Sequence, residues 1–220
     1  MQLAKAFLFD MNGTMVNDMQ YHISAWHRIF NGFGANIGIQ KMKEECYGKN
    51  HEVIERILPG RFSEAEKDKM SLEKEKQYQR DFRPCLKLID GLEKFLEESH
   101  EAGIKLGIGS AAIRFNIDFV LDGLSIRKYF DAIVTADDVK KSKPNPETWL
   151  KCADLLNTPP ADCIVFEDSP KGAESALNAG MRCIVITTLH KEEEFEQYKN
   201  VIAFISDFND IFITNFLKTA

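Results

Sequence analysis

The sequence lacks three features, and each absence argues against a class of protein. It has five cysteines, an odd number, and no two of them form a C-x-x-C pair, which is typical of reduced thiols in a cytosolic protein and offers no zinc site. No apolar run approaches the roughly 20 residues that a membrane-spanning helix needs. Basic residues are outnumbered by acidic ones, and the formal net charge of -6 argues against nucleic acid or an anionic membrane as the main partner.

The start of the chain shows no basic segment, apolar stretch and small-residue cleavage site in that order, so we expect no signal peptide and a cytoplasmic protein. The chain has 220 residues, of which 44% are hydrophobic and 28% charged, an ordinary balance for a globular protein with a core. This length predicts one domain with an insert, or two small domains.

Six apolar runs of strand type alternate with helical patterns along most of the chain. The strand candidates are residues 4–9, 105–109, 132–135, 163–167, 182–187 and 201–205. The helical patterns between them are residues 91–102, 113–121, 146–155 and 171–179. This alternation predicts an α/β fold with a doubly wound, Rossmann-like parallel sheet.

The region from Val16 to Arg83 breaks the alternation, because it contains no convincing strand and much of it is helical in pattern. Ser63 is followed by Glu64 and Glu66, which is typical of the start of a helix. We therefore expect a core made of residues 1–15 and 88–220, with a helical cap domain of residues 16–87 inserted after the first strand.

Polar side chains follow four of the candidate strands or lie in the turns between elements. They are Asp10 and Asn12, Ser110, Lys143, and Glu167 with Asp168. In a doubly wound sheet, residues at the carboxyl ends of the strands gather at one edge, where ligands bind. Carboxylates, an ammonium and a hydroxyl together suit magnesium-assisted transfer of a phosphoryl group, since Mg²⁺ prefers oxygen ligands and a carboxylate can accept the group as a nucleophile.

With these residues in view, the chain resembles the haloacid dehalogenase-like superfamily. The stretch 10–14, Ser110, Lys143 and the pair Glu167 and Asp168 are similar to its four motifs, in order and over nearly the whole chain. Residues 167–180 and the helical insert resemble the branch that contains phosphatases and β-phosphoglucomutases.

The resemblance implies a role for each core residue. Asp10 would be the nucleophile that carries the phosphoryl group, and Ser110, with the backbone N–H of Ala111, would bind a phosphoryl oxygen. Lys143 would neutralise Asp10 and the transferring oxygens. Mg²⁺ would be held by Asp10, the backbone carbonyl of Asn12 and Asp168, with Glu167 bound directly or through water.

Asn12 departs from the superfamily pattern, which has an acid–base Asp two residues after the nucleophile. An amide does not exchange a proton usefully near neutral pH, so turnover is in question while phosphate and Mg²⁺ binding are expected to survive. Four explanations stay open. Another group supplies the proton, with Asp18, His22, Lys49 and His51 as candidates; the chemistry is slow; the residue is an engineered trap; or Asn12, followed by Gly13, deamidates in part to Asp.

Five cap residues are candidates for substrate binding. His22 and Trp26 lie four apart and share a helix face. His22 resembles the cap histidine of β-phosphoglucomutases, and packing roles are the alternatives for both residues. Lys49 and His51 lie in a stretch that resembles the cap loop of those enzymes, although they usually have Arg at the position of His51. Lys74 lies where they have a phosphate-facing Lys, and a solvated helix face is its alternative.

The sequence therefore predicts Mg²⁺-dependent phosphoryl transfer through an aspartyl-phosphate, most simply hydrolysis of a small phosphomonoester such as a sugar phosphate. A hexose phosphate mutase and a non-catalytic protein that binds a phosphorylated metabolite are the alternatives. A nicotinamide dehydrogenase is disfavoured because no G-x-G-x-x-G follows the first strand. A dehalogenase is disfavoured by the carboxylate pair at 167 and 168. A monomer is the default expectation.

Overall fold

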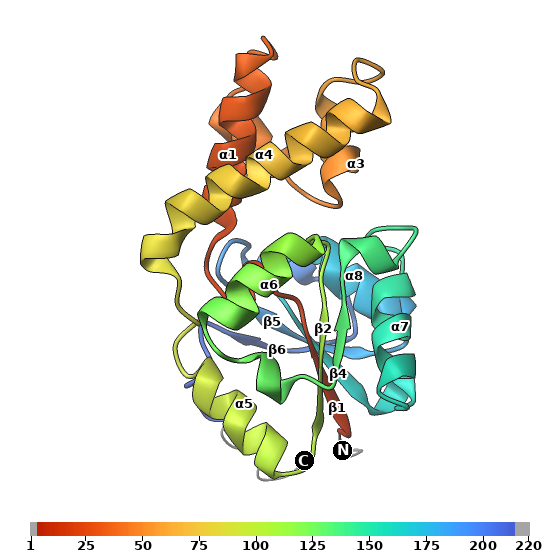
Figure 1. Cartoon of the computed structure of the whole chain (residues 1–220). Helices are drawn as coiled ribbons and strands as arrows, with labels where there is room; N and C mark the ends of the chain where they lie inside the picture. Colours follow the sequence, from red (N-terminus) through yellow and green to blue (C-terminus); the bar gives the residue numbers. More distant parts are fainter. Residues whose placement is uncertain (1–3, 214–220) are drawn as a thin grey trace. The chain divides into compact units, whose positions relative to one another are not determined.

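The structure is a computed structural model that describes residues 4–213 and consists of two compact units. The first unit contains the residues up to Asn17 together with those from Lys87 on, and the second contains Asp18–Leu86 (Figure 1). Among the described residues, no helix has both the length and the apolar character required to cross a bilayer.

The first unit is built on a parallel sheet of six strands in the order β3-β2-β1-β4-β5-β6 (Figure 1). The strands are β1 (Ala6–Phe9), β2 (Lys105–Gly109), β3 (Ala132–Val134), β4 (Cys163–Glu167), β5 (Arg182–Ile186) and β6 (Val201–Ile205). This architecture confirms the predicted doubly wound parallel sheet.

Helices follow the strands, as expected for a parallel sheet. The α-helices of this unit are α5 (Leu92–Glu101), α6 (Arg114–Gly123), α7 (Glu147–Leu155) and α8 (Pro170–Asn178). Short 3₁₀ turns occupy Arg127–Tyr129, Ala136–Asp138, Pro160–Asp162 and Glu192–Phe195. Each α-helix lies within two residues of a predicted helical pattern.

Alternate side chains of the strands pack on opposite faces of the sheet. Phe7 of β1 stacks on Phe95 of α5, with ring centroids 5.4 Å apart, on one face. Leu8, the next residue, belongs to the apolar cluster on the other face, which includes Trp149 of α7 and Ala173 of α8. Because both faces are covered, β1 and β4 are buried along their whole length.

The strand order reverses at β1, which pairs with β2 on one side and with β4 on the other. In open α/β sheets, the crevice at such a reversal, beyond the carboxyl ends of the strands, is where ligands bind. Asp10 follows β1 and Glu167 ends β4. The topology therefore places both carboxylates at the reversal point.

The second unit consists of helices joined by loops. Its helices are α1 (Met19–Gly32), α2 (Ile39–Glu45), α3 (Asn50–Ile57) and α4 (Glu64–Phe82), followed by a 3₁₀ turn at Arg83–Cys85. Helix α4 begins after Ser63, where a helix start was predicted, and Ser63 caps it: its side chain accepts from the N–H of Glu66, whose own carboxylate accepts from the N–H of Ser63. An apolar cluster that includes Trp26, Phe30 and Met42 fills the space between the helices.

Candidate functional site

The loop after β1 is shaped by the residue that follows Asn12. Gly13 has φ +80°, a conformation that side chains disfavour, and a Cβ atom there would lie 2.0 Å from the carboxylate Oδ2 of Asp168. Asp10 is fixed at the start of the loop by its N–H, which donates to the carbonyl of Phe166 at 2.9 Å. Gly13 is therefore required for the close approach of the loops that follow β1 and β4.

Two hydrogen bonds hold Gly13 in place. Its N–H donates to the carbonyl of Val16 at 2.8 Å, and its carbonyl accepts from the hydroxyl of Thr188 at 2.6 Å. Deamidation of Asn12 requires the backbone nitrogen of Gly13 to attack the side-chain amide of Asn12. Since that nitrogen is engaged in the turn, the folded loop opposes the reaction.

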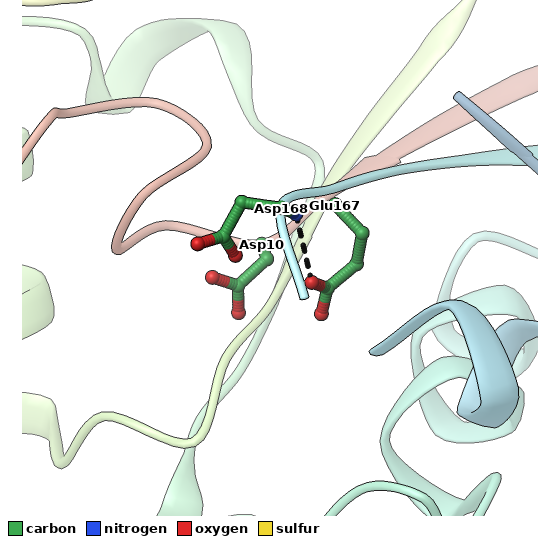
Figure 2. Close-up of side chains that lie close together, drawn as sticks. All are labelled: Asp10, Glu167 and Asp168. Atoms are coloured by element: carbon green, nitrogen blue, oxygen red, sulfur yellow. Dashed lines mark hydrogen bonds between the residues drawn. The ribbon is translucent and has the colours of Figure 1, made fainter. Parts of the chain in front are cut away.

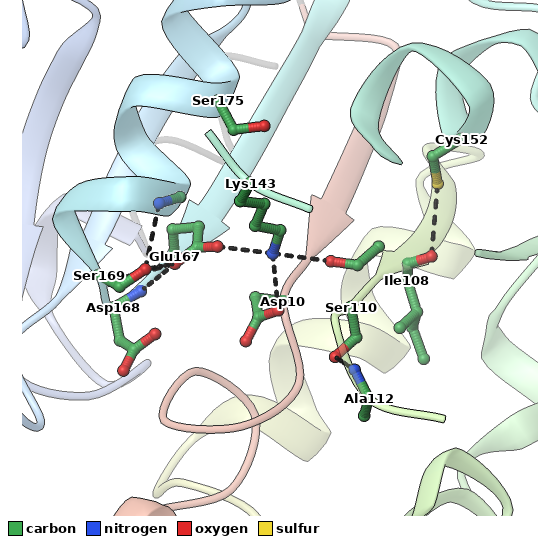
Figure 3. Close-up of polar contacts among 12 residues, drawn as sticks. Asp10, Ile108, Ser110, Ala112, Lys143, Cys152, Glu167, Asp168, Ser169 and Ser175 are labelled. Carbon is green, nitrogen blue, oxygen red and sulfur yellow. Dashed lines mark hydrogen bonds and ion pairs between the residues drawn. The ribbon is translucent and has the colours of Figure 1, made fainter. Parts of the chain in front are cut away.

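Lys143 is the central cation of the site (Figure 3). Its Nζ lies 2.7 Å from Oδ1 of Asp10, 2.7 Å from Oε1 of Glu167 and 3.0 Å from the carbonyl oxygen of Gly109. Burial lowers the pKa of Lys143, but the carboxylates of Asp10 and Glu167 outweigh burial and hold that pKa well above its usual value. Lys143 therefore stays protonated, and its ammonium contacts residues at the ends of β1, β2 and β4. Its partner Asp10 lies 133 positions away in the sequence.

Glu167 is held by donors on both carboxylate oxygens (Figure 3). Oε1 accepts from Lys143, while Oε2 accepts from the backbone N–H groups of Asp168 and Ser169 at 2.9 and 3.0 Å and from the Ser169 hydroxyl at 3.0 Å. A Cβ atom on Gly172 would lie 1.8 Å from the Glu167 carboxyl carbon. Gly172 thus leaves the space that the carboxylate fills at the start of α8.

Three carboxylates gather at the reversal point (Figure 2). Asp10, Glu167 and Asp168 are buried, and ligand atoms from the three lie within 4.8 Å of one another. These three carboxylates and the ammonium of Lys143 have a formal net charge of two minus, and buried negative charge is costly without a counter-ion. Oxygen donors with that charge fit a divalent metal ion.

Ser110 and Ala111 lie at the end of β2, beside β1. Phe9 pairs with Ile108, so Ser110 begins the loop that neighbours the loop of Asp10. The N–H of Ser110 donates to the carbonyl of Val134, and its hydroxyl oxygen accepts from the N–H of Ala112 at 3.2 Å. Both interactions fix Ser110 in a tight turn; the roles of Ser110 and Ala111 in binding a phosphoryl oxygen stay predictions.

In the helical unit, His22 and Lys74 belong to a buried polar network. Nζ of Lys74 lies 2.7 Å from Nδ1 of His22 and 3.0 Å from both carboxylate oxygens of Glu75. Nε2 of His22 lies 3.4 Å from Oδ2 of Asp18, which also accepts from the hydroxyl of Tyr78 at 2.5 Å. Lys74 is only 3% exposed, so the alternative of a solvated helix face is wrong for it.

The other cap candidates lie elsewhere in the unit. Trp26 is 1% exposed and stacks on Phe30 at 4.9 Å, the arrangement of a packing residue. Lys49 precedes α3 as its N-cap. Both ring nitrogens of His51 lie near carboxylates, Nδ1 3.2 Å from Glu64 and Nε2 2.9 Å from Asp68. Contact of any of these residues with a substrate stays a prediction.

Sequence reasoning missed several residues that shape the site and the network. They are Trp149, Ser169 and Thr188 in the first unit, and Glu75 and Tyr78 in the second. One signal was available for Tyr78: it lies four residues after Lys74 on one helix, as His22 lies four residues after Asp18 near the start of another, and residues at this spacing share a helix face.

Comparison with known proteins agrees with this geometry. Fructose-1-phosphate phosphatase YqaB of Escherichia coli is 29% identical over 83% of this chain and 96% of its own, and β-phosphoglucomutase of Bacillus subtilis is 30% identical over 80% of each. The crystal structure of a β-phosphoglucomutase from Clostridium difficile superposes with a TM-score of 0.85 at 28% identity, covering 99% of this chain and 98% of that one.

The family model described as haloacid dehalogenase-like hydrolase matches residues 7–186, a span that contains all four groups of polar residues at the strand ends. Family, fold and relatives agree with the resemblance drawn from the motifs. The chain therefore belongs to the haloacid dehalogenase-like hydrolases, as an enzyme of their phosphatase and phosphomutase kind.

Proposed function

We propose that this chain is a Mg²⁺-dependent phosphatase that hydrolyses a small phosphomonoester, such as a sugar phosphate, through an aspartyl-phosphate on Asp10. The observation that supports it most directly is the contact of Lys143 with both Asp10 and Glu167 at 2.7 Å, beside Asp168. This arrangement combines a buried carboxylate nucleophile with a fixed positive charge at the place where a phosphoryl group develops negative charge.

The reaction has two steps on the residues of this chain. A carboxylate oxygen of Asp10 forms a bond to phosphorus while the bond from phosphorus to the ester oxygen breaks, and the leaving oxygen takes up a proton from solvent water. A second water then attacks phosphorus and gives a proton back to solvent, while the bond between phosphorus and Asp10 breaks, which releases inorganic phosphate and restores the carboxylate. Lys143 stabilises the negative charge on the phosphoryl oxygens in both steps, with Ser110 as a further donor.

Mg²⁺ fits the carboxylate cluster by charge and by ligand type. Asp10, Asp168 and the backbone carbonyl of Asn12 would hold it, and Glu167 would act through water, because both of its carboxylate oxygens already accept hydrogen bonds. When bound, Mg²⁺ neutralises charge on the phosphoryl oxygens.

Hydrolysis is favoured over the mutase alternative by the charge balance of the cap. A mutase must hold a second phosphate, which requires cationic side chains. Lys74 is paired with Glu75, and His51 is paired with Glu64 and Asp68. Because carboxylates of the same unit lie against both of these side chains, a substrate with one phosphate suits this chain better.

Phosphate release from a panel of sugar monophosphates, with Mg²⁺ and with EDTA, tests the proposal. We expect release with Mg²⁺, none with EDTA, and none from the Asp10→Asn variant, which also forms no phosphoenzyme. A requirement for a catalytic bisphosphate without net phosphate release would identify a mutase. Saturable binding of a sugar phosphate without turnover at any pH would identify a non-catalytic protein, and an active Asp10→Asn variant would refute the mechanism.

A further inference from the structure

Trp149 of α7 lies against the ammonium group of Lys143. The indole is fully buried, and Nζ of Lys143 lies 4.2 Å from the centroid of its ring. The three hydrogens of the ammonium match its three oxygen acceptors, on Asp10, Glu167 and Gly109. The aromatic face is therefore an additional contact of a cation whose hydrogen-bonding capacity is already used.

The indole is held in this position by the end of β2. A Cβ atom on Gly109 would lie 2.5 Å from Cζ3 of Trp149, so the ring occupies the space that any larger residue would fill. Within residues 4–213, Nε1 of Trp149 has no hydrogen-bond partner although it is buried. A buried indole whose N–H is unpaired, while its face meets an ammonium, is placed for the face rather than for the N–H.

We propose that Trp149 is a positioning residue, whose aromatic face keeps the Lys143 ammonium at the distance that serves both Asp10 and Glu167. A lysine side chain has several rotatable bonds, and without an aromatic ring packed against it the ammonium can shift toward one carboxylate or toward water. A desolvated contact between a cation and an aromatic face is strong enough to oppose that shift. The catalytic part of this inference rests on the proposed phosphatase function.

Two substitutions separate the aromatic face from simple volume. Trp149→Phe keeps an aromatic face and removes the unpaired N–H, whereas Trp149→Leu keeps an apolar side chain without that face. We expect kcat for the best sugar phosphate to fall about 5- to 30-fold in Trp149→Leu, the range that such a contact corresponds to, and less than about 3-fold in Trp149→Phe. KM is expected to change little in either, since the orientation of Lys143 acts on the reacting oxygens.

A second measurement does not depend on activity. A double-mutant cycle combines Trp149→Leu with Lys143→Met, and urea unfolding is followed without Mg²⁺. We expect a coupling equivalent to at least about 5-fold in the unfolding equilibrium constant. In a second cycle with Trp149→Phe in place of Trp149→Leu, we expect a smaller coupling, because Phe keeps an aromatic face against Lys143. An inactive wild type with intact coupling would refute the phosphatase proposal and leave the contact established. Zero coupling, or equal kcat losses in the Phe and Leu variants, would overturn the role of Trp149.

If Trp149→Leu fails to fold, fluorinated tryptophan is incorporated at position 149 instead. Trp26 is the other tryptophan of the chain, so a Trp26→Phe background leaves Trp149 as the labelled position. Fluorine withdraws charge from the ring face with little change in shape. A stepwise fall in kcat with increasing fluorination supports the proposal, and an unchanged kcat overturns it.

Discussion

At position 12, the side chain is an amide on a loop whose neighbouring residues resemble the first motif of the superfamily. The metal role proposed for position 12 uses its backbone carbonyl, which Asn and Asp share, and the next residue, Gly13, is fixed by Val16 and Thr188. What the amide cannot do is give a proton to the leaving group and then take one from water. Under the proposed mechanism, the consequence of Asn12 is therefore expected in proton transfer.

We predict that Asn12→Asp raises turnover of small phosphoesters by at least about tenfold, since general acid–base catalysis contributes roughly 10²–10⁴-fold. The measurement is steady-state phosphate release, after peptide mass analysis has verified that residue 12 of the wild type is an amide. Asp10→Asn in the Asn12→Asp background serves as the control and is expected to be inactive. If turnover does not rise, the proton is transferred by another group or the site does not turn over.

At the scale of single elements, α4 shows why a charge-rich helix is difficult to interpret from sequence. Residues 73–76 are all charged, which predicts a solvated face, yet Lys74 and Glu75 are buried while Glu73 and Lys76 are exposed. The burial arises because Lys74 contacts His22, 52 positions away, and Glu75 contacts Asn50. These partners lie on other helices and are brought to α4 by the packing of the unit. The spacing and composition of residues within α4 therefore do not predict them.

We predict that Glu75→Gln destabilises the helical unit by about 3–5 kcal/mol, because it leaves the buried ammonium of Lys74 without its counter-charge. Burial raises the pKa of Glu75, but Lys74 and His22 outweigh burial and lower it. The ionised form therefore stabilises the fold above the pKa of the unfolded chain, and this contribution is lost as the pH falls through the lower, folded-state value.

Thermal unfolding at neutral and acidic pH measures this effect. Glu73→Gln is the matched control, since Glu73 is exposed on the same helix, and we expect it to change stability by less than about 0.5 kcal/mol. The difference between the two variants should shrink as the pH is lowered. Equal stabilities of the two variants at neutral pH would contradict the importance of the buried pair.

At the scale of the whole molecule, the sheet could be predicted because both faces of β1 and β4 are buried, which makes the strands continuous apolar runs. The motif residues could be found because each one follows a strand or a turn at the same edge. Trp149 and Thr188 could not, since their roles depend on contacts with Lys143 and Gly13 that only the folded sheet creates. The cap domain was expected to span residues 16–87, and the second compact unit spans Asp18–Leu86.

The distribution of charge over the two units leads to a last prediction. Asp10, Glu167 and Asp168 all belong to the unit that contains the sheet, and Mg²⁺ bound there, as proposed, would stabilise that unit by mass action, by about 2.7 kcal/mol at a concentration 100 times the Kd. We expect amide hydrogen exchange in β1 and β4 to slow by up to about 100-fold on addition of Mg²⁺, with little change in α1 and α4. Asp168→Asn should weaken the response, because it removes one of the three carboxylates. Equal slowing in the helices of both units, or no slowing in β1 and β4, would argue against a metal site confined to the carboxylate cluster. Slowing of exchange confined to these strands would locate the metal site independently of any catalytic measurement.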